Sequence, residues 1–120
     1  GNILYDFGDM VRTTTSPTME DEMDLTKVKL RLPLFKALAR GYLKSTKDIL
    51  TKKEKKLIAF SGKMMTFTIG LRFLTDYLSG DTYFRFHRPR HNLDRTRTQI
   101  KLIQSIEKQE DKMQAYVDSL

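Results

Sequence analysis

The sequence of 120 residues contains no cysteine and no tryptophan. The lack of cysteine excludes disulfides, thiolate metal sites and a cysteine nucleophile. No stretch approaches the roughly 18 apolar residues of a membrane helix, because the longest uncharged apolar run extends only from Met64 to Leu71. The first residues show neither a basic start nor an apolar export segment. We therefore expect a cytoplasmic protein with no membrane partner.

The composition is that of one small soluble domain with a folded core: 39% of the residues are hydrophobic, 10% aromatic and 31% charged. The net charge of +7 is unevenly spread, since residues 1–24 carry six acids and one base, a balance of −5, and residues 25–120 carry +12. Such asymmetry is typical of a nucleic-acid-binding body, or of a piece of a larger protein whose complementary charge lies elsewhere.

Local patterns in the first half predict helices joined by short connections. Residues 5–14 are predicted as a short helix, followed by a loop through Pro17 and an acidic run over residues 20–24. Alternating apolar and basic residues over 27–32 predict a brief extended segment. Pro33 can open the next helix, because its missing N–H would be unpaired in a first turn, and this helix should end near Ser45. Its apolar stripe is Leu34, Phe35, Leu38, Tyr42 and Leu43.

The clearest helical pattern follows. Thr51 and Glu54 form a capping box, and Gly80 stands where a left-handed C-terminal residue is expected. The predicted helix has about 27 residues and is roughly 40 Å long. Gly62 and Gly70 would weaken it by about 1 kcal/mol each unless a close neighbour needs the space. Its main apolar stripe is Leu57, Phe60, Met64, Phe67, Leu71, Leu74 and Leu78, and a second set, Ile58, Met65, Ile69, Phe73 and Tyr77, requires that more than one face be covered.

A last helix of similar length is predicted from about Asn92. Its inward residues are expected to be Leu93, Ile100, Ile103, Ile106, Met113 and Val117. A compact domain of this size has a radius of gyration of about 14 Å. Two helices of about 40 Å would therefore form an elongated bundle, or a helical lobe whose apolar faces need another domain. We predict the second arrangement, an all-α fragment.

Two short motifs resemble kinase elements but lack the required context. Asp6-Phe7-Gly8 has the letters of the protein-kinase magnesium motif, yet only five residues precede it. The favoured interpretation is a helix start with Asp6 as an N-terminal cap or a backbone acceptor. The segment from His91 to Asp94 has the wrong spacing for a kinase catalytic loop and is interpreted as the entry to the last helix. No phosphate loop, zinc signature or Ser-His-Asp set is present, so no metal site is predicted.

Basic residues interleave with aromatic ones over residues 83–101, where Asp94 is the only acid from residue 85 onward. Such a cluster could bind a phosphate backbone and stack on bases. It more often forms a solvated face or a surface that meets an acidic neighbour. We therefore expect no nucleic-acid partner and keep this function as the weakest alternative.

Four ordered blocks, which span nearly the whole chain, resemble the C-terminal part of N-acetylhexosamine 1-kinases, within the aminoglycoside-phosphotransferase and choline-kinase-like superfamily. Some of their relatives carry the label of mucin desulfatase. The blocks are Tyr5-Asp6-Phe7-Gly8-Asp9-Met10-Val11-Arg12-Thr13; Gly41-Tyr42-Leu43 and Leu50-Thr51 with Glu54; Arg72-Phe73-Leu74-Thr75-Asp76-Tyr77-Leu78 with Gly80-Asp81 and Tyr83-Phe84; and His91-Asn92-Leu93 with Arg95 and Arg97-Thr98-Gln99.

The resemblance implies a bilobal kinase that transfers phosphate from ATP, with magnesium, to the anomeric hydroxyl of an N-acetylhexosamine. In that family an N-terminal lobe holds ATP, and a mainly helical C-terminal lobe holds the sugar. The family's catalytic and metal-binding aspartates precede the first block. Residues 1–120 are therefore expected to be a single helical fragment of the C-terminal lobe, without the N-terminal lobe and catalytic loop, and inactive alone.

By the same resemblance, the sugar-contacting arginine and tyrosine fall on Arg72 and Tyr83, and Asp6 becomes a structural buttress for the catalytic loop. Arginine offers a planar fork of donors for hydroxyl and acetamide oxygens, and tyrosine offers a flat face with a polar tip. Asp76, one turn after Arg72, could form an intrahelical ion pair with it or orient it for the sugar. A free-standing helical interaction module, which could dimerise through spare apolar faces, remains the main alternative.

Overall fold

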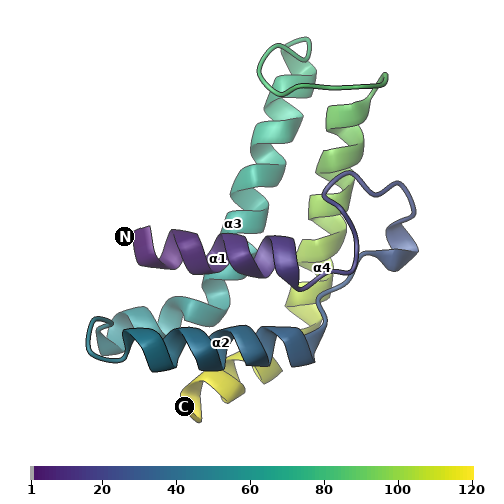
Figure 1. Ribbon diagram of the computed structural model, residues 1–120. Coiled ribbons are helices and arrows are strands. Elements are labelled where there is room, and N and C mark those ends of the chain that lie inside the picture. The colour runs from purple at the N-terminus through teal and green to yellow at the C-terminus, as the bar shows by residue number, and fades with distance from the viewer. Residues whose placement is uncertain (1) are drawn as a thin grey trace.

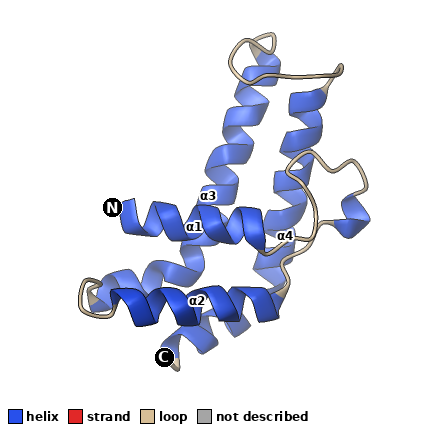
Figure 2. Ribbon diagram, in the orientation of Figure 1, coloured by secondary structure: helices blue, strands red, loops and turns tan. Residues whose placement is uncertain are grey.

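The protein is all-α, as the sequence predicts. The computed structural model describes residues 2–120, with side chains from Leu4 onward, and contains no strand within that part of the chain (Figure 2). The helices are α1 (Asn2–Thr14), α2 (Leu32–Thr46), α3 (Lys52–Leu78) and α4 (His91–Asp118), with a short 3₁₀ turn, η1 (Leu25–Lys27).

The two long helices, α3 and α4, run antiparallel, and α1 and α2 lie across their lower part (Figure 1). The radius of gyration is 15.0 Å, and the molecule measures 45 × 28 × 18 Å. The core lies where the four helices meet, and its largest fully buried side chains include Phe7, Phe35, Ile58 and Ile106. The loop between α3 and α4 therefore projects at one end, away from this core.

The sequence signals predicted for helix starts and ends are confirmed for α2 and α3. Thr51 accepts the backbone N–H of Glu54, and the Glu54 side chain accepts that of Thr51, so the predicted capping box is present. Gly80 follows α3 with φ +94°, the left-handed conformation that glycine adopts most readily. Pro33 lies in the first turn of α2. Asp6, in contrast, lies inside α1 and is exposed, so the prediction that it caps a helix start is wrong.

Glycines allow the helices to approach closely. A Cβ added at Gly62 would lie 2.6 Å from Val11 Cγ1 on α1, and one at Gly70 would lie 3.0 Å from Gln99 Cβ on α4. Both glycines therefore provide the space that α1 and α4 occupy. Ser61 and Gly62 also form a Ser–Gly pair of the kind at which helices kink, and α3 bends along its length (Figure 1).

The link between η1 and α2 is extended, as the alternation predicts. Val28 and Leu30 are buried, while Lys27 and Lys29 between and beside them are exposed. The Leu30 N–H donates to Ser105 Oγ on α4 at 2.9 Å. The extended segment is thus held against α4 by a hydrogen bond to the Ser105 side chain, and it pairs with no strand in the described part of the chain.

The expectation that more than one apolar face of α3 is covered is not met among the described residues. Most of the main stripe is exposed, including Leu57, Phe67, Leu71 and Leu78, with 47%, 60%, 51% and 75% of their surface accessible. The buried face is instead the second apolar set together with small residues, namely Ile58, Ala59, Ser61, Gly62, Met65, Thr66, Gly70, Phe73 and Asp76. The face with small residues is buried because small side chains let α1 and α4 pack close to α3.

The predicted inward face of α4 is wrong in the first half of that helix. Ile100 is half exposed, whereas Asn92, Asp94, Thr96, Thr98 and Gln99 are buried there. Only in the second half do the predicted residues Ile106, Met113 and Val117 form the core. The upper part of the α3–α4 pair is therefore packed through polar side chains, which must find hydrogen-bond partners.

By length and composition α3 could cross a membrane, but 44% of its most apolar window is buried inside the protein. A core helix of a soluble protein can pass the same test of length and composition. The expectation that no stretch of the chain approaches a membrane helix is therefore too strong for α3.

Candidate functional site

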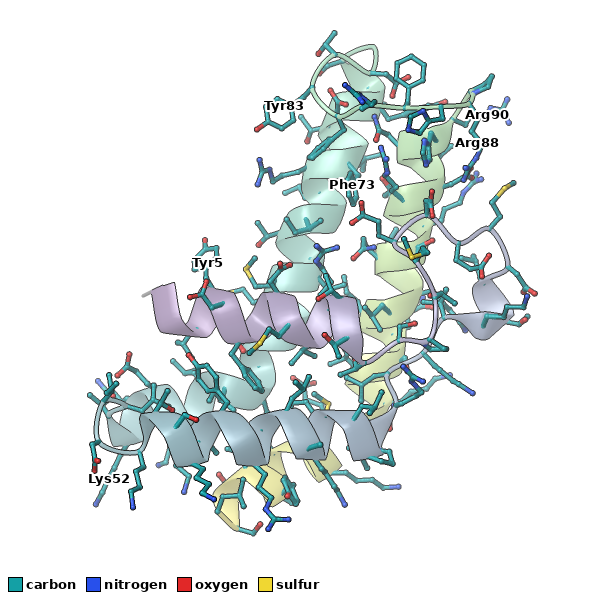
Figure 3. All side chains as sticks on the ribbon, in the orientation of Figure 1. Tyr5, Lys52, Phe73, Tyr83, Arg88 and Arg90 are labelled. Atoms are coloured by element: carbon teal, nitrogen blue, oxygen red, sulfur yellow. The ribbon has the colours of Figure 1, made fainter. Side chains whose placement is uncertain are left out.

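A groove of about 460 Å³ lies at the C-terminal end of α3, where the chain turns toward α4. Figure 3 labels Tyr83 in the turn and Phe73 on α3 near this end. The lining residues come from the last two turns of α3 and the following loop: Leu71, Arg72, Thr75, Asp76, Ser79, Thr82, Tyr83 and Phe84. The three residues predicted from the sequence as a sugar site thus line one groove.

Arg72 lies beside two aromatic rings of the loop. Its guanidinium carbon is 5.8 Å from the ring centre of Tyr83 and 5.9 Å from that of Phe84. These distances are within the range of cation–π attraction, which holds the charged group along the groove wall. Among the described residues no carboxylate lies within 4.0 Å of Arg72, so the ion pair with Asp76 does not form.

Asp76 binds the loop instead. Its Oδ1 accepts the backbone N–H groups of Thr82 at 3.0 Å and Tyr83 at 2.7 Å, and its Oδ2 accepts that of Phe84 at 3.0 Å. The carboxylate is almost fully buried, with 5% of the residue accessible. One side chain therefore satisfies three successive loop donors and fixes the backbone that carries Tyr83.

Burial opposes ionisation of Asp76, because a charged carboxylate loses hydration there. The N–H groups of Phe84, Tyr83 and Thr82 outweigh this effect and hold the pKa of the carboxyl below its ordinary value. Asp76 is therefore ionised at neutral pH, and its charge is taken up by hydrogen bonds.

Tyr83 and Phe84 form a small aromatic cluster with Phe73. The rings of Tyr83 and Phe84 meet edge to face at 4.9 Å, and Phe84 lies 4.8 Å from Phe73. Phe73 is buried, so it anchors the cluster to α3, whereas Tyr83 is 73% exposed. The outer ring thus presents a flat apolar face to the groove, next to the Arg72 cation.

The fourth predicted residue, Asp6, is not part of this groove. It is exposed on α1, and its neighbour Tyr5 lies well apart from Tyr83 in Figure 3. The structure therefore brings together Arg72, Asp76 and Tyr83 but leaves Asp6 elsewhere. Its role as a buttress stays a prediction.

The basic start of α4 meets the acidic loop that follows α1. Arg88 donates to the Asp94 carboxylate and to the Asp21 carbonyl, each at 3.2 Å. His91 accepts the His87 N–H at Nδ1, so its Nε2 carries the proton that is shared with Asp21 at 2.7 Å. This hydrogen bond from His91 holds the pKa of Asp21 below its ordinary value, against the opposing effect of burial.

Glu20 in the same loop accepts a hydrogen bond from Arg12 of α1 at 3.2 Å and lies 3.9 Å from Arg95 of α4. The acids of this loop therefore find basic partners on α1 and at the start of α4. Arg85, Arg90 and Arg97 remain exposed.

Sequence reasoning assigned no role to Asn92, Asp81 or the hydroxyl residues of the groove wall. Asn92 and Asp81 stand within the blocks that carry the family resemblance, which was the available signal. Asn92 contacts Asp81 and Asp76, which lie 11 and 16 positions before it in the sequence. Helical periodicity cannot reveal contacts over such separations.

No protein-family model matches the chain. Within the described part of the chain, no group of three or more His, Asp or Glu side chains could hold a metal ion.

Proposed function

We propose that this chain is the helical, sugar-binding part of the C-terminal lobe of an ATP-dependent kinase that phosphorylates the anomeric hydroxyl of an N-acetylhexosamine. One observation carries the proposal. Arg72, with no carboxylate partner among the described residues, lies 5.8 Å from the Tyr83 ring in a shared groove. The proposed reaction follows from the family resemblance, and the groove is the proposed binding site for the sugar.

The chemistry of the groove supports a sugar ligand. The guanidinium of Arg72 can donate two parallel hydrogen bonds to hydroxyl or acetamide oxygens. The exposed face of Tyr83 can cover the apolar side of a sugar ring or its acetyl methyl group. A volume of about 460 Å³ falls in the range of small-molecule sites. Asp76 contributes by positioning the loop.

ATP and magnesium belong to other parts of the parent kinase in this proposal. Phosphoryl transfer needs a metal, groups that clamp the phosphates and a positioned base. The chain by itself is accordingly proposed to be inactive, and the parent enzyme to be cytoplasmic.

Substitution of Arg72 in the full-length kinase tests the assignment. Arg72→Ala should raise the KM for the sugar or lower kcat while ATP binding changes little, because only the sugar contact is lost. Arg97→Ala, which removes an exposed arginine of α4, is the matched control and should leave both substrates unaffected. Unchanged sugar kinetics in Arg72→Ala would refute the proposed contact.

The exposed stripe of α3 favours a second candidate function, a helical interaction module. Phe67, Leu71 and Leu74 border a shallow, almost wholly apolar groove with Ile100 and Ile103 of α4. In the kinase proposal this face meets another part of the protein, the missing N-terminal lobe included. In the module proposal it mediates dimerisation. Analytical ultracentrifugation of the chain separates the two: a tight dimer that Phe67→Lys dissociates favours the module.

Nucleic-acid binding is the least supported candidate. Arg12, Arg88 and Arg95, which could contact phosphates, face the acidic loop at Glu20 and Asp21. Salt-dependent binding of an oligonucleotide would favour it.

A further inference from the structure

Asn92, in the first turn of α4, joins the loop to that helix. Its side chain is fully buried. Nδ2 donates to Asp76 Oδ2 at 2.8 Å and to Asp81 Oδ1 at 3.0 Å. Both N–H groups of the amide are therefore used, one on each carboxylate.

Arg95 fixes which way this amide points. Its Nη1 donates to Asn92 Oδ1 at 2.7 Å and to the backbone carbonyl of Arg85 at 2.9 Å. Its guanidinium carbon also lies 5.6 Å from the ring centre of Phe73. Because Oδ1 must face Arg95, Nδ2 must face the two aspartates. The loop from Thr82 to Arg85 is thus held at its start by Asp76 and at its end by Arg95.

We propose that Asn92 is a positioning residue for the sugar-facing loop and acts through Asp76. This inference rests on the proposed function for its link to the sugar, but the loop geometry stands independently. Asn92 presents two donors and no negative charge to a pair of carboxylates. It thereby lets Asp76 keep its oxygens on the N–H groups of Tyr83 and its neighbours.

An aspartate at position 92 has nearly the same shape but the opposite chemistry. It can accept from Arg95, but an ionised carboxylate cannot donate to Asp76 or Asp81. Three carboxylates would then lie together, two of them buried, at positions 76 and 92, and one partly buried, Asp81. Arg95 is the cation that contacts position 92, and Glu20 lies 3.9 Å from Arg95. Arg72 lies beyond the aromatic rings. Like charges at this distance favour uptake of a proton, and a protonated carboxyl can again donate.

The test is Asn92→Asp in the 120-residue chain, with Gln104→Asp as the matched control. Gln104 is exposed on α4, so the control adds the same charge away from the site. Amide exchange is measured by NMR at about pH 7 and about pH 5, and N-acetylglucosamine is titrated at both values. In Asn92→Asp we expect protection of amides 82–84 to fall roughly tenfold at the higher pH, because their acceptor is displaced, and to recover at the lower pH. The control should match the wild-type chain.

The outcomes are distinguishable. Wild-type protection of amides 82–84 in Asn92→Asp at both pH values would overturn the positioning role. A pH-reversible loss of protection, with no sugar-induced shifts in any form of the chain, would support the positioning role and contradict the proposed function. If Asn92→Asp does not fold at pH 7, Asn92→Ser replaces it, because its neutral hydroxyl can serve only one of the two carboxylates. We expect partial, pH-independent loss of protection there, and full protection would overturn the proposal.

Discussion

The carboxylate of Asp76 accepts the backbone N–H of Tyr83 over 2.7 Å, so the last turn of α3 determines where the exposed ring of the groove lies. Replacement by asparagine removes the charge and one acceptor. In Asp76→Asn we expect amides 82–84 to exchange roughly tenfold faster, because a buried donor is left without its partner. Asp118→Asn, at the exposed end of α4, is the control and should change nothing in this loop. Unaltered exchange in Asp76→Asn would contradict the anchoring role.

The same carboxylate should make stability depend on pH. Its pKa in the folded protein lies below the unfolded value, which is about 3.9 for aspartate. The stabilisation from Asp76 is therefore fully present above about pH 4 and is lost as the pH falls through the folded pKa. Urea unfolding of the wild-type chain and Asp76→Asn should differ at pH 7 and converge in acid. A difference that does not shrink on acidification would show that the ionised carboxylate does not stabilise the fold.

Much of the secondary structure could be predicted because its signals are local. The capping box at Thr51, the proline of α2 and Gly80 each act within a few residues of a helix end, and all three are confirmed. The buried face of α3 could not be predicted from periodicity, because apolar residues lie on more than one side of that helix. The small residues Ala59, Gly62 and Gly70, which mark close contacts, were the better guide.

The candidate site was predictable only in part. Arg72, Asp76 and Tyr83 were found through resemblance and chemistry, and they do line one groove. The donors that hydrogen-bond to the Asp76 carboxylate could not be identified from the sequence, because the loop N–H groups and Asn92 follow Asp76 by 6 to 16 positions.

Two adjacent residues of α3 test its orientation. Ile58 is fully buried, whereas Leu57 is 47% exposed. Ile58→Ala should lower the free energy of unfolding by about 2–5 kcal/mol, because it removes core contacts and leaves a cavity. Leu57→Ala should cost about 1 kcal/mol or less. Equal losses in urea titrations, or a larger loss at Leu57, would mean that α3 is rotated about its axis.

Two glycines test the close approach of α1 and α3. Gly62→Ala places a methyl group against Val11 and should destabilise the protein by about 1–3 kcal/mol. Gly41, inside α2, has no atom within 4 Å of an added Cβ, so Gly41→Ala should stabilise by about 0.5–1 kcal/mol through helix propensity. Thermal denaturation of both variants should thus give shifts of opposite sign. A stabilised Gly62→Ala protein would rule out the crossing.

The central claim is that the groove beside Arg72 and Tyr83 binds an N-acetylhexosamine, and saturation-transfer NMR on the chain tests it most directly. Irradiation of the protein should transfer saturation to the acetyl methyl protons of N-acetylglucosamine, because that group would lie against the Tyr83 ring. The signal should fall severalfold in Tyr83→Ala and Arg72→Ala and persist in Arg97→Ala. No transfer to the sugar, or equal transfer in all four proteins, would contradict the account.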